Sequence, residues 1–327
     1  MGSVVPFLIA AAVAIVLCPI FAFVGVRIGI VDRPGELKIH QDPVPVTGGF
    51  AVVVAVILGT VVGGHGNPWV VAAACLALAG GMVDDMRPLP PWVRLVVQAA
   101  AGTLLVLGGL RLEPLAGLGG VALVVVTMAC CNATNMLDGQ DGLASGLGVT
   151  AGLGIAGLMV AGGFSAALPL AVAGGLAGFL VWNRPPARVF LGDGGAYAVG
   201  VLLAAAAAQT PASGWHGSIA SGACLGVFAY ELVTTIIRRL VAEAPTIHGD
   251  RDHSYDRLGV RLGSRVSATL VMWALGIVAA LIGMAVLTLR APQALVLIGA
   301  TFALTAVLDI RLLPVSTPRR IDEHRTA

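Results

Sequence analysis

Charged residues are scarce in this chain of 327 amino acids. Only 11% of the residues are Asp, Glu, Lys or Arg, against about a quarter in a typical globular domain, and Lys38 is the single lysine. Hydrophobic residues make up 57% of the chain, and the mean hydropathy is +0.94. This composition excludes an ordinary water-soluble fold and indicates a protein that lies in a lipid bilayer.

Long polar stretches are also lacking. Apolar segments follow one another from residue 4 to 312, so we expect one domain over residues 1–327, with 314–327 as a short tail. The first apolar segment runs for about 23 residues with no Lys or Arg ahead of it, which is unlike a cleaved signal peptide. We therefore expect it to remain as a membrane span.

Cysteine is used sparingly and without a metal-site pattern. The five cysteines lie in or beside apolar segments, and none is spaced from a histidine as in a metal site. Buried free thiols are the expected outcome, with disulfides or metal ligation as the less favoured alternative.

The apolar segments predict an all-α, polytopic membrane helix bundle. Runs of roughly 17 to 24 residues are long enough to cross the hydrocarbon core. They predict about 11 transmembrane helices, with ten as the alternative, over these ranges: 4–26, 48–64, 68–84, 92–110, 118–135, 143–163, 166–182, 194–209, 217–237, 266–289 and 293–312.

The distribution of basic residues predicts the orientation of this bundle. Short cytoplasmic loops carry an excess of Lys and Arg. With an extracytoplasmic N-terminus and a cytoplasmic C-terminus, all of the 19 basic residues except Arg111 and Arg290 fall on the inner side. Nearly all the carboxylates fall there too, apart from Glu113 outside and Glu231 and Asp309 within apolar segments. One membrane face therefore carries the polar chemistry.

Two adjacent carboxylates, Asp84 and Asp85, end the third apolar segment. The C-terminal end of a helix is the negative end of its dipole, which disfavours each anion by about 0.3–1 kcal/mol. A hard divalent cation together with phosphate oxygens would offset this cost. Two solvated aspartates paired with Arg87 are the alternative.

Oxygen-bearing side chains recur every three residues at the end of the fifth segment: Asn132, Asn135, Asp138 and Asp141. On a helical turn this spacing directs side chains roughly the same way, so we expect the four groups to face one space. Gly139 and Gly142 would let a ligand approach the backbone. A polar loop with glycine turns would explain the glycines but not the spacing.

A third polar stretch runs from Asn183 to Asp193, at the start of the eighth segment. Phe190 offers a stacking face for a base, and Arg184 and Arg188 offer charge for a phosphate. Capping of the following helix by Asp193 is the simpler alternative. An interfacial anchor is the alternative for the aromatic and basic residues.

Two inner loops add basic groups. The loop at about 238–265 holds Arg251, His253 and Arg257, which suit a diphosphate whose bond is breaking, although a solvated loop is the alternative. Lys38 lies in the first inner loop as a compact point charge. Glu231 and Arg238 are seven residues apart on one helical face, where an ion pair is the structural interpretation.

Together these segments resemble the polyprenyl-phosphate N-acetylhexosamine-1-phosphate transferase family, which starts lipid-linked glycan assembly. Five separated stretches carry the resemblance, in the family's order along the chain: 38–49, 83–85, 132–144, 183–193 and 250–258. The number of predicted helices also agrees with the family.

The resemblance implies a role for each matching residue. Asp84 and Asp85 would engage the lipid phosphate, one of them as a base, and Asp138, Asp141 and His253 would join them as catalytic residues. The substrate-binding group would be Lys38, Asn132, Asn135, Asn183, Phe190 and Arg251. Asp193, with Asp85, would bind Mg²⁺, with Mn²⁺ as an alternative. One-step transfer and a route through a phospho-aspartate both stay open.

The implied reaction moves N-acetylhexosamine-1-phosphate, most simply of the N-acetylglucosamine type, from a UDP-sugar to an undecaprenyl or decaprenyl phosphate. Its site would face the cytoplasm from the plasma membrane, in contact with membrane lipid, without nucleic acid, and a homodimer is compatible with this. The last motif continues Ser254-Tyr255-Asp256 after His253 where relatives often have histidines, which leaves the sugar open. A muramoyl-pentapeptide phosphotransferase and a membrane transporter are the alternatives.

Overall fold

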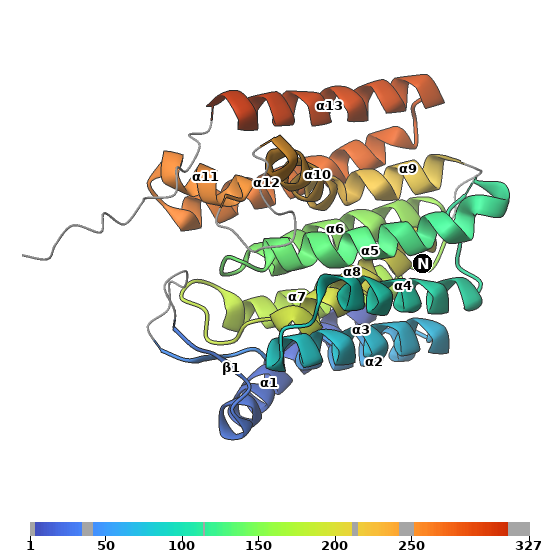
Figure 1. The fold of residues 1–327 in the computed structure, drawn as a ribbon. Helices are drawn as coiled ribbons and strands as arrows, with labels where there is room; N and C mark the ends of the chain where they lie inside the picture. The colour runs from blue at the N-terminus through green and yellow to red at the C-terminus, as the bar shows by residue number, and fades with distance from the viewer. Residues whose placement is uncertain (1–3, 35–41, 114, 211–214, 242–251, 313–327) are drawn as a thin grey trace, which may run out of the picture.

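Helices lying side by side make up almost all of the structure, a computed structural model that describes residues 4–34, 42–113, 115–210, 215–241 and 252–312 (Figure 1). The first half contains α1 (Val5–Ile28), α2 (Gly48–Val62), α3 (Pro68–Met86), α4 (Pro91–Leu107), α5 (Gly119–Leu137) and α6 (Leu143–Ala161). The second half contains α7 (Ala167–Asn183), α8 (Gly192–Ala208), α9 (Trp215–Cys224), α10 (Gly226–Val241), α11 (Ser254–Leu262), α12 (Arg265–Val286) and α13 (Ala291–Leu312).

The helices begin and end where local sequence dictates. Asn67 accepts a hydrogen bond from the Trp69 amide at 2.9 Å and so caps α3, whose first residue is a proline. Ser264 caps α12 in the same way. Gly29 ends α1 and Gly263 ends α11 in the left-handed conformation that glycine adopts without strain.

Helix α8 forms the centre of the bundle. All of its residues except Asp193 and Ala208 are buried, and it packs against α2, α3 and α5. Small residues allow this burial: a Cβ on Gly49 would lie 2.3 Å from Gly195, and one on Gly200 would lie 2.5 Å from the Cys131 backbone. Close contact between helix backbones is typical of bundles in membranes.

Outer helices direct bulky apolar side chains away from the protein. Helix α1, for example, exposes Leu8, Val16, Ile20 and Phe23 by half or more of their surface. In water such a surface would drive aggregation, whereas in lipid it is the expected exterior. The membrane assignment from composition is thereby confirmed.

Each of the 11 predicted ranges coincides with helix, but their lengths differ from the prediction. By length and composition, α1, α3, α5, α6 and α12 are able to cross a membrane. The predicted ninth span is two helices, α9 and α10, bent by 72°, which would make a sixth crossing if the pair counts as one. Helices α2, α4, α7 and α8 and residues Pro292–Ala303 are apolar but shorter.

Three elements were not expected from the sequence. Short strands β1 (Val31–Asp32) and β2 (Val44–Pro45) pair antiparallel, with Val31 opposite Pro45. Helix α11 forms within a stretch that was predicted as loop, and α10 is viewed almost along its axis in Figure 1 because of the bend after α9. The described cysteines are all free thiols, as expected.

Candidate active site

Asp85 joins the end of α3 to the start of α8. Its Oδ1 accepts a hydrogen bond from the Asp193 amide at 2.9 Å, and its Oδ2 accepts one from the Gly194 amide at 3.1 Å. The first amides of a helix lack partners within the helix, and its positive end favours an anion. Asp85 is therefore the carboxylate that caps α8, a role that the sequence had offered as the alternative for Asp193.

Glycines bring these two helix ends together. A Cβ on Gly81, one turn before Asp85, would lie 2.5 Å from the backbone of Asp193 and from Gly194. Real Cβ atoms do not approach backbone so closely, so a larger residue at position 81 would separate α3 from α8. The carboxylate of Asp85 reaches the amides because position 81 has no side chain.

Asp84 is buried beside Asp85 and has three partners. It accepts hydrogen bonds from the Tyr197 hydroxyl at 2.9 Å and the Leu89 amide at 2.8 Å, and it pairs with the Arg94 guanidinium at 2.8 Å. Arg94 lies at the start of α4 and Tyr197 in α8, so the contacts of Asp84 join three helices. The sequence had offered Arg87 as the partner, but Arg87 is exposed and Arg94 takes that place.

Asp193 and Asp138 complete a cluster of four carboxylates. Asp193 accepts a hydrogen bond from Asn135 and lies within hydrogen-bonding range of the Asp84 carboxyl. Asp138 follows the end of α5 and interacts with the Gly192 amide. Burial, together with the negative charges of Asp193 and Asp85, raises the pKa of Asp138 well above its usual range. We call Asp84, Asp85, Asp138 and Asp193 the aspartate cluster.

The three-residue repeat does not direct all its members into one space. Asn135 and Asp138 face the aspartate cluster, but Asn132 donates to Gln98 at 2.7 Å and Asp141 accepts from the Ala187 amide at 2.9 Å. Asn132 and Asn135 lie on α5, where a step of three residues falls about 60° short of a full rotation, whereas Asp138 and Asp141 follow the end of the helix, so the four side chains diverge. The expectation of a single shared space is corrected accordingly.

Asn183 and Asp141 hold the loop that precedes α8. The buried Asn183 accepts from the Gly142 amide and the Ser145 hydroxyl, both at 3.0 Å, and donates to the Val189 carbonyl at 3.0 Å. These bonds fix the loop around Gly142, which has a positive φ of 75°. The structure thus gives both residues a positioning function, and their predicted direct roles toward substrate or catalysis stay predictions.

The backbone of Phe190 is held between β2 and α2. Its amide donates to the Pro45 carbonyl at 2.9 Å, and its carbonyl accepts from the Gly48 amide at 3.0 Å. The residue is half-buried two positions before Gly192. Its predicted role beside a base stays a prediction, while Lys38 and Arg251 lie outside the residues that the structure describes.

A second polar cluster surrounds His253. Its Nδ1 lies 2.9 Å from Oε1 of Glu231, a carboxylate with no solvent exposure. Thr235 donates to the same oxygen at 3.0 Å, and the Arg238 guanidinium lies 3.4 Å from it. The predicted pairing of Glu231 with Arg238 is confirmed, and His253 proves to be a further partner of the same carboxylate.

Tyr255 links the His253 cluster to the aspartate cluster. Its ring stacks on His253 with centroids 5.3 Å apart, and its hydroxyl donates to the Met136 carbonyl at 3.0 Å. Met136 precedes Asp138 by two residues. A Cβ on Gly139 would lie 2.2 Å from the Tyr255 hydroxyl, so the loop requires glycine there. The two clusters therefore lie at the same face of the bundle.

Comparison with known proteins gives concordant matches. The family described as glycosyl transferase family 4 matches residues 68–210, which include the whole aspartate cluster. A decaprenyl-phosphate N-acetylglucosaminephosphotransferase of Mycobacterium tuberculosis is 31% identical over 77% of this chain and 75% of its own length. The chain belongs to glycosyl transferase family 4.

Other relatives of this family 4 member carry two kinds of name. A probable undecaprenyl-phosphate N-acetylglucosaminyl 1-phosphate transferase of Bacillus subtilis is 27% identical over 84% of this chain and 82% of its own length. A phospho-N-acetylmuramoyl-pentapeptide-transferase of Moorella thermoacetica is 30% identical over 87% of this chain and 98% of its own length. The expected resemblance is thereby confirmed.

The donor chemistry of the aspartate cluster fits a hard divalent cation. Four carboxylates converge with one guanidinium, and two of them, Asp84 and Asp193, lie in contact, which leaves negative charge for a cation to offset. Among the described residues, no three Asp, Glu, His or Cys side chains are set as a ready metal cage. Mg²⁺ usually takes only one or two carboxylates and completes its shell with water and phosphate.

Two functional contacts of this family 4 member escaped the sequence analysis. Tyr197 binds Asp84, and its position four residues after Asp193 on one helix face was a usable signal. Arg94 had been counted only as a charge on the inner face, because its contact with Asp84 depends on the turn between α3 and α4. No local sequence pattern predicts an ion pair of this kind across a turn between two helices.

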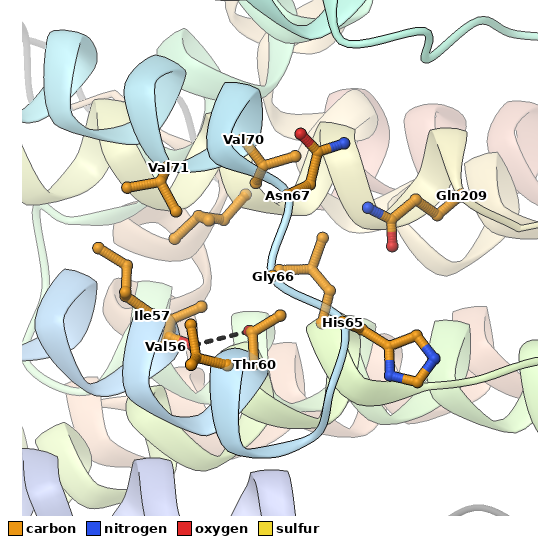
Figure 2. Close-up of a pocket in the computed structure, with 12 residues that line it drawn as sticks. Val56, Ile57, Thr60, His65, Gly66, Asn67, Val70, Val71 and Gln209 are labelled. Carbon is orange, nitrogen blue, oxygen red and sulfur yellow. Dashed lines mark hydrogen bonds between the residues drawn. The ribbon is translucent and has the colours of Figure 1, made fainter.

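Among the residues that the structure describes, the opposite end of α8 gathers no cluster of carboxylates like that around Asp193. Figure 2 shows a pocket there, lined by residues from the α2–α3 connection such as His65 and Asn67 and by Gln209 after α8. Its volume is only about 20 Å³, room for one water molecule.

Proposed function

We propose that this protein transfers N-acetylglucosamine-1-phosphate from its UDP-linked form to a polyprenyl phosphate and releases UMP. The observation that carries the proposal is the aspartate cluster, which gathers carboxylates from α3, α5 and α8 within the residues that match the family. The printed names of the Bacillus subtilis and Mycobacterium tuberculosis relatives favour this sugar. Transfer of a muramoyl-pentapeptide unit is the second candidate, because of the Moorella thermoacetica relative.

In the proposed reaction, an oxygen of the lipid phosphate forms a bond to the sugar-linked phosphorus of the donor. The bond from that phosphorus to the oxygen of UMP breaks, and UMP leaves with the electron pair. Mg²⁺, held by Asp193 with Asp84 and Asp138 nearby, would supply charge neutralisation for the diphosphate. Positioning and charge compensation are the main requirements for such a transfer.

The protein's own groups divide these tasks. Both carboxylate oxygens of Asp85 accept hydrogen bonds from α8 amides, and these bonds fix the position of Asp193. Tyr197 and Arg94 fix Asp84 in the same way. Burial and the neighbouring negative charges raise the pKa of Asp138, so its carboxyl holds a proton more readily than an ordinary aspartate and is the one best suited to exchange a proton with substrate.

His253 would meet the diphosphate from the other side. The carboxylate of Glu231 lies 2.9 Å from Nδ1 of His253 and orients the imidazole. Lys38 and Arg251 are proposed to add charge there, as the family resemblance implies. The polar face of the bundle, with the aspartate cluster, would face the cytoplasm of a plasma-membrane protein with about 11 spans and an extracytoplasmic N-terminus.

The decisive experiment uses purified protein, polyprenyl phosphate, Mg²⁺ and a panel of UDP-sugars. UMP release and the lipid product, identified by mass spectrometry, are measured together. We expect a product only with UDP-N-acetylglucosamine, none with Asp193→Asn, and loss of activity with EDTA that Mg²⁺ restores. A product only from the UDP-muramoyl-pentapeptide donor would move the assignment to the second candidate. Substrate uptake by vesicles without UMP release would indicate a transporter.

A further inference from the structure

An apolar cavity of about 480 Å³ lies away from the aspartate cluster, among α9, α10, α11, α12 and α13. Its walls are formed by side chains such as Val227, Val271, Leu275, Ala279 and Phe302. A volume of this size is within the range of about 300–1,000 Å³ that ligand sites occupy. In water such a space would collapse or fill with ligand, and in a membrane it is filled from the lipid.

The length of the cavity matches half a bilayer. It follows α12 from Val271 to Ile282, and at 1.5 Å per residue this stretch is about 16 Å long. The hydrocarbon core of a bilayer is about 30 Å thick, so the cavity spans about one leaflet. That is the depth to which the acyl chain of a phospholipid extends.

The charged group of the cavity lies at one end, whereas the hydroxyl groups of Tyr230, Thr301 and Thr305 line it from α10 and α13. Arg261 and Ser254, both from α11, line that end, and Tyr255 of the same helix places it at the face that carries the aspartate cluster. Arg261 is exposed and makes no hydrogen bond or ion pair with the part of the chain that the structure describes. Its charge therefore has no protein partner there, and an anion at the membrane surface would supply one.

We propose that this cavity binds an anionic membrane phospholipid, with one acyl chain between α10 and α12 and the phosphate at Arg261. The Arg261 guanidinium lies where the phosphate of a phospholipid would lie, and the length of the apolar cavity suits an acyl chain that spans one leaflet. A polyprenyl chain such as those in the relatives' names would overrun a space of this length. The proposal concerns a lipid other than the acceptor and goes beyond the proposed transfer reaction.

The test compares phosphatidylglycerol with phosphatidylcholine of identical acyl chains. Purified protein in detergent is titrated with each lipid, and bound lipid is counted by native mass spectrometry alongside the melting temperature. We expect phosphatidylglycerol to bind about fivefold more tightly, the effect of one basic residue at a membrane surface. Arg261→Gln should abolish this preference, whereas Arg290→Gln, at the far end of α12, should keep it.

A second variant tests the cavity independently of charge. Ala279 lines the cavity, so Ala279→Leu places a larger side chain into the space and should lower binding of both lipids at least threefold without loss of folding. Equal binding of both lipids by the unaltered protein, or unchanged binding by Ala279→Leu, would overturn the proposal. So would displacement of the bound lipid by undecaprenyl phosphate, which would assign the cavity to the acceptor.

Two controls separate this inference from the proposed function. UMP release by Arg261→Gln in detergent should equal that of the unaltered protein, because Arg261 lies outside the aspartate cluster. A lipid preference found in a protein that releases no UMP would keep the lipid site and reject the transferase. If light scattering shows that Ala279→Leu converts a dimer to a monomer, the cavity is filled by a second copy and the lipid proposal is overturned.

Discussion

The half of the molecule around α8 is packed more tightly than the part of α9 to α13 that surrounds the cavity. Around α8, glycines bring backbones into contact, as at Gly81 beside Gly194 and Gly49 beside Gly195. Among α9 to α13, a cavity of about 480 Å³ separates the helices, and a Cβ on Gly222 would meet nothing within 4 Å. In the tight half, around α8, carboxylates bond to backbone amides, and these bonds would be lost if the helices moved apart. In the loose half, formed by α9 to α13, the cavity leaves room for lipid.

Removal of charge from the tight half should have the largest effect. Asp193→Asn keeps the volume but removes the anion at the centre of the cluster, and transfer should fall by about 10³-fold or more. The melting temperature should change little, because Asn135 can still bond to the new amide. Initial rates of UMP release measure the effect, and Asp42→Asn, outside the cluster, is the control. A rate within tenfold of the unaltered enzyme would contradict the site assignment.

A methyl group at position 81 tests the tight packing itself. Gly81→Ala must move α3 away from α8, because the new Cβ would lie 2.5 Å from the Asp193 backbone. We expect a loss of about 1–3 kcal/mol in stability and, since Asp85 would lose its amides, of about 100-fold in rate. Thermal unfolding and UMP release are measured together. Unchanged values for both would show that the two helix ends are not in contact.

The contact between Glu231 and His253 lies within the half formed by α9 to α13 and should matter less. Glu231→Gln keeps the shape but removes the charge that orients the imidazole 2.9 Å away. Loss of such an outer partner typically costs about 10–100-fold in activity. Initial rates of UMP release and the melting temperature are measured together. A lower melting temperature with an unchanged rate would indicate a purely structural contact.

Removal of the charge of Asp138 should raise the stability of the protein, in contrast to the preceding substitutions. Its pKa in the folded protein is raised above the unfolded value of about 3.9, so the folded state binds more protons than the unfolded state and loses stability as pH rises. Asp138→Asn should therefore melt a few degrees higher than the unaltered protein at pH 7 in EDTA, and the difference should shrink toward pH 4. A lower melting temperature at pH 7 would refute charge repulsion in the cluster.

An added methyl group should be tolerated in the loose half, formed by α9 to α13, although the tight half, around α8, has no room for one at position 81. Gly222→Ala adds a methyl group where nothing lies within 4 Å, and alanine favours helix over glycine by about 0.5–1 kcal/mol. We expect a small rise in melting temperature and no change in UMP release. Together with Gly81→Ala this gives a matched pair of identical substitutions. Equal destabilisation by both would erase the contrast between the halves.

Composition and periodicity predicted the helices well because apolar length is a local property. All 11 ranges coincide with helix, and only the bend between α9 and α10 and the short α11 were missed. Leu225, where the bend lies, stands in a run without proline, so its position depends on packing against α12 and not on local sequence. The number of crossings and the orientation of the chain stay predictions.

The aspartates themselves were predictable, but their division of work was not. Asp84, Asp85, Asp138 and Asp193 converge as expected, since each lies at a helix end on one face. Asp85 caps α8 and Arg94 pairs with Asp84, and both contacts depend on how separate helices pack. Spacing within one segment carries no information on such partners, which is also why the repeat from Asn132 to Asp141 was misread.

The bond between Asp85 and the Asp193 amide closes over 108 residues. A ribosome adds about 5–20 residues per second, so the carboxylate of a nascent chain waits roughly 5–20 s before its partner has been synthesised. Until then α3 lacks α8, whose amides bind the Asp85 carboxylate at the polar end of α3. Ribosome-bound intermediates that end before α8 therefore lack the amides that the Asp85 carboxylate binds in the finished protein.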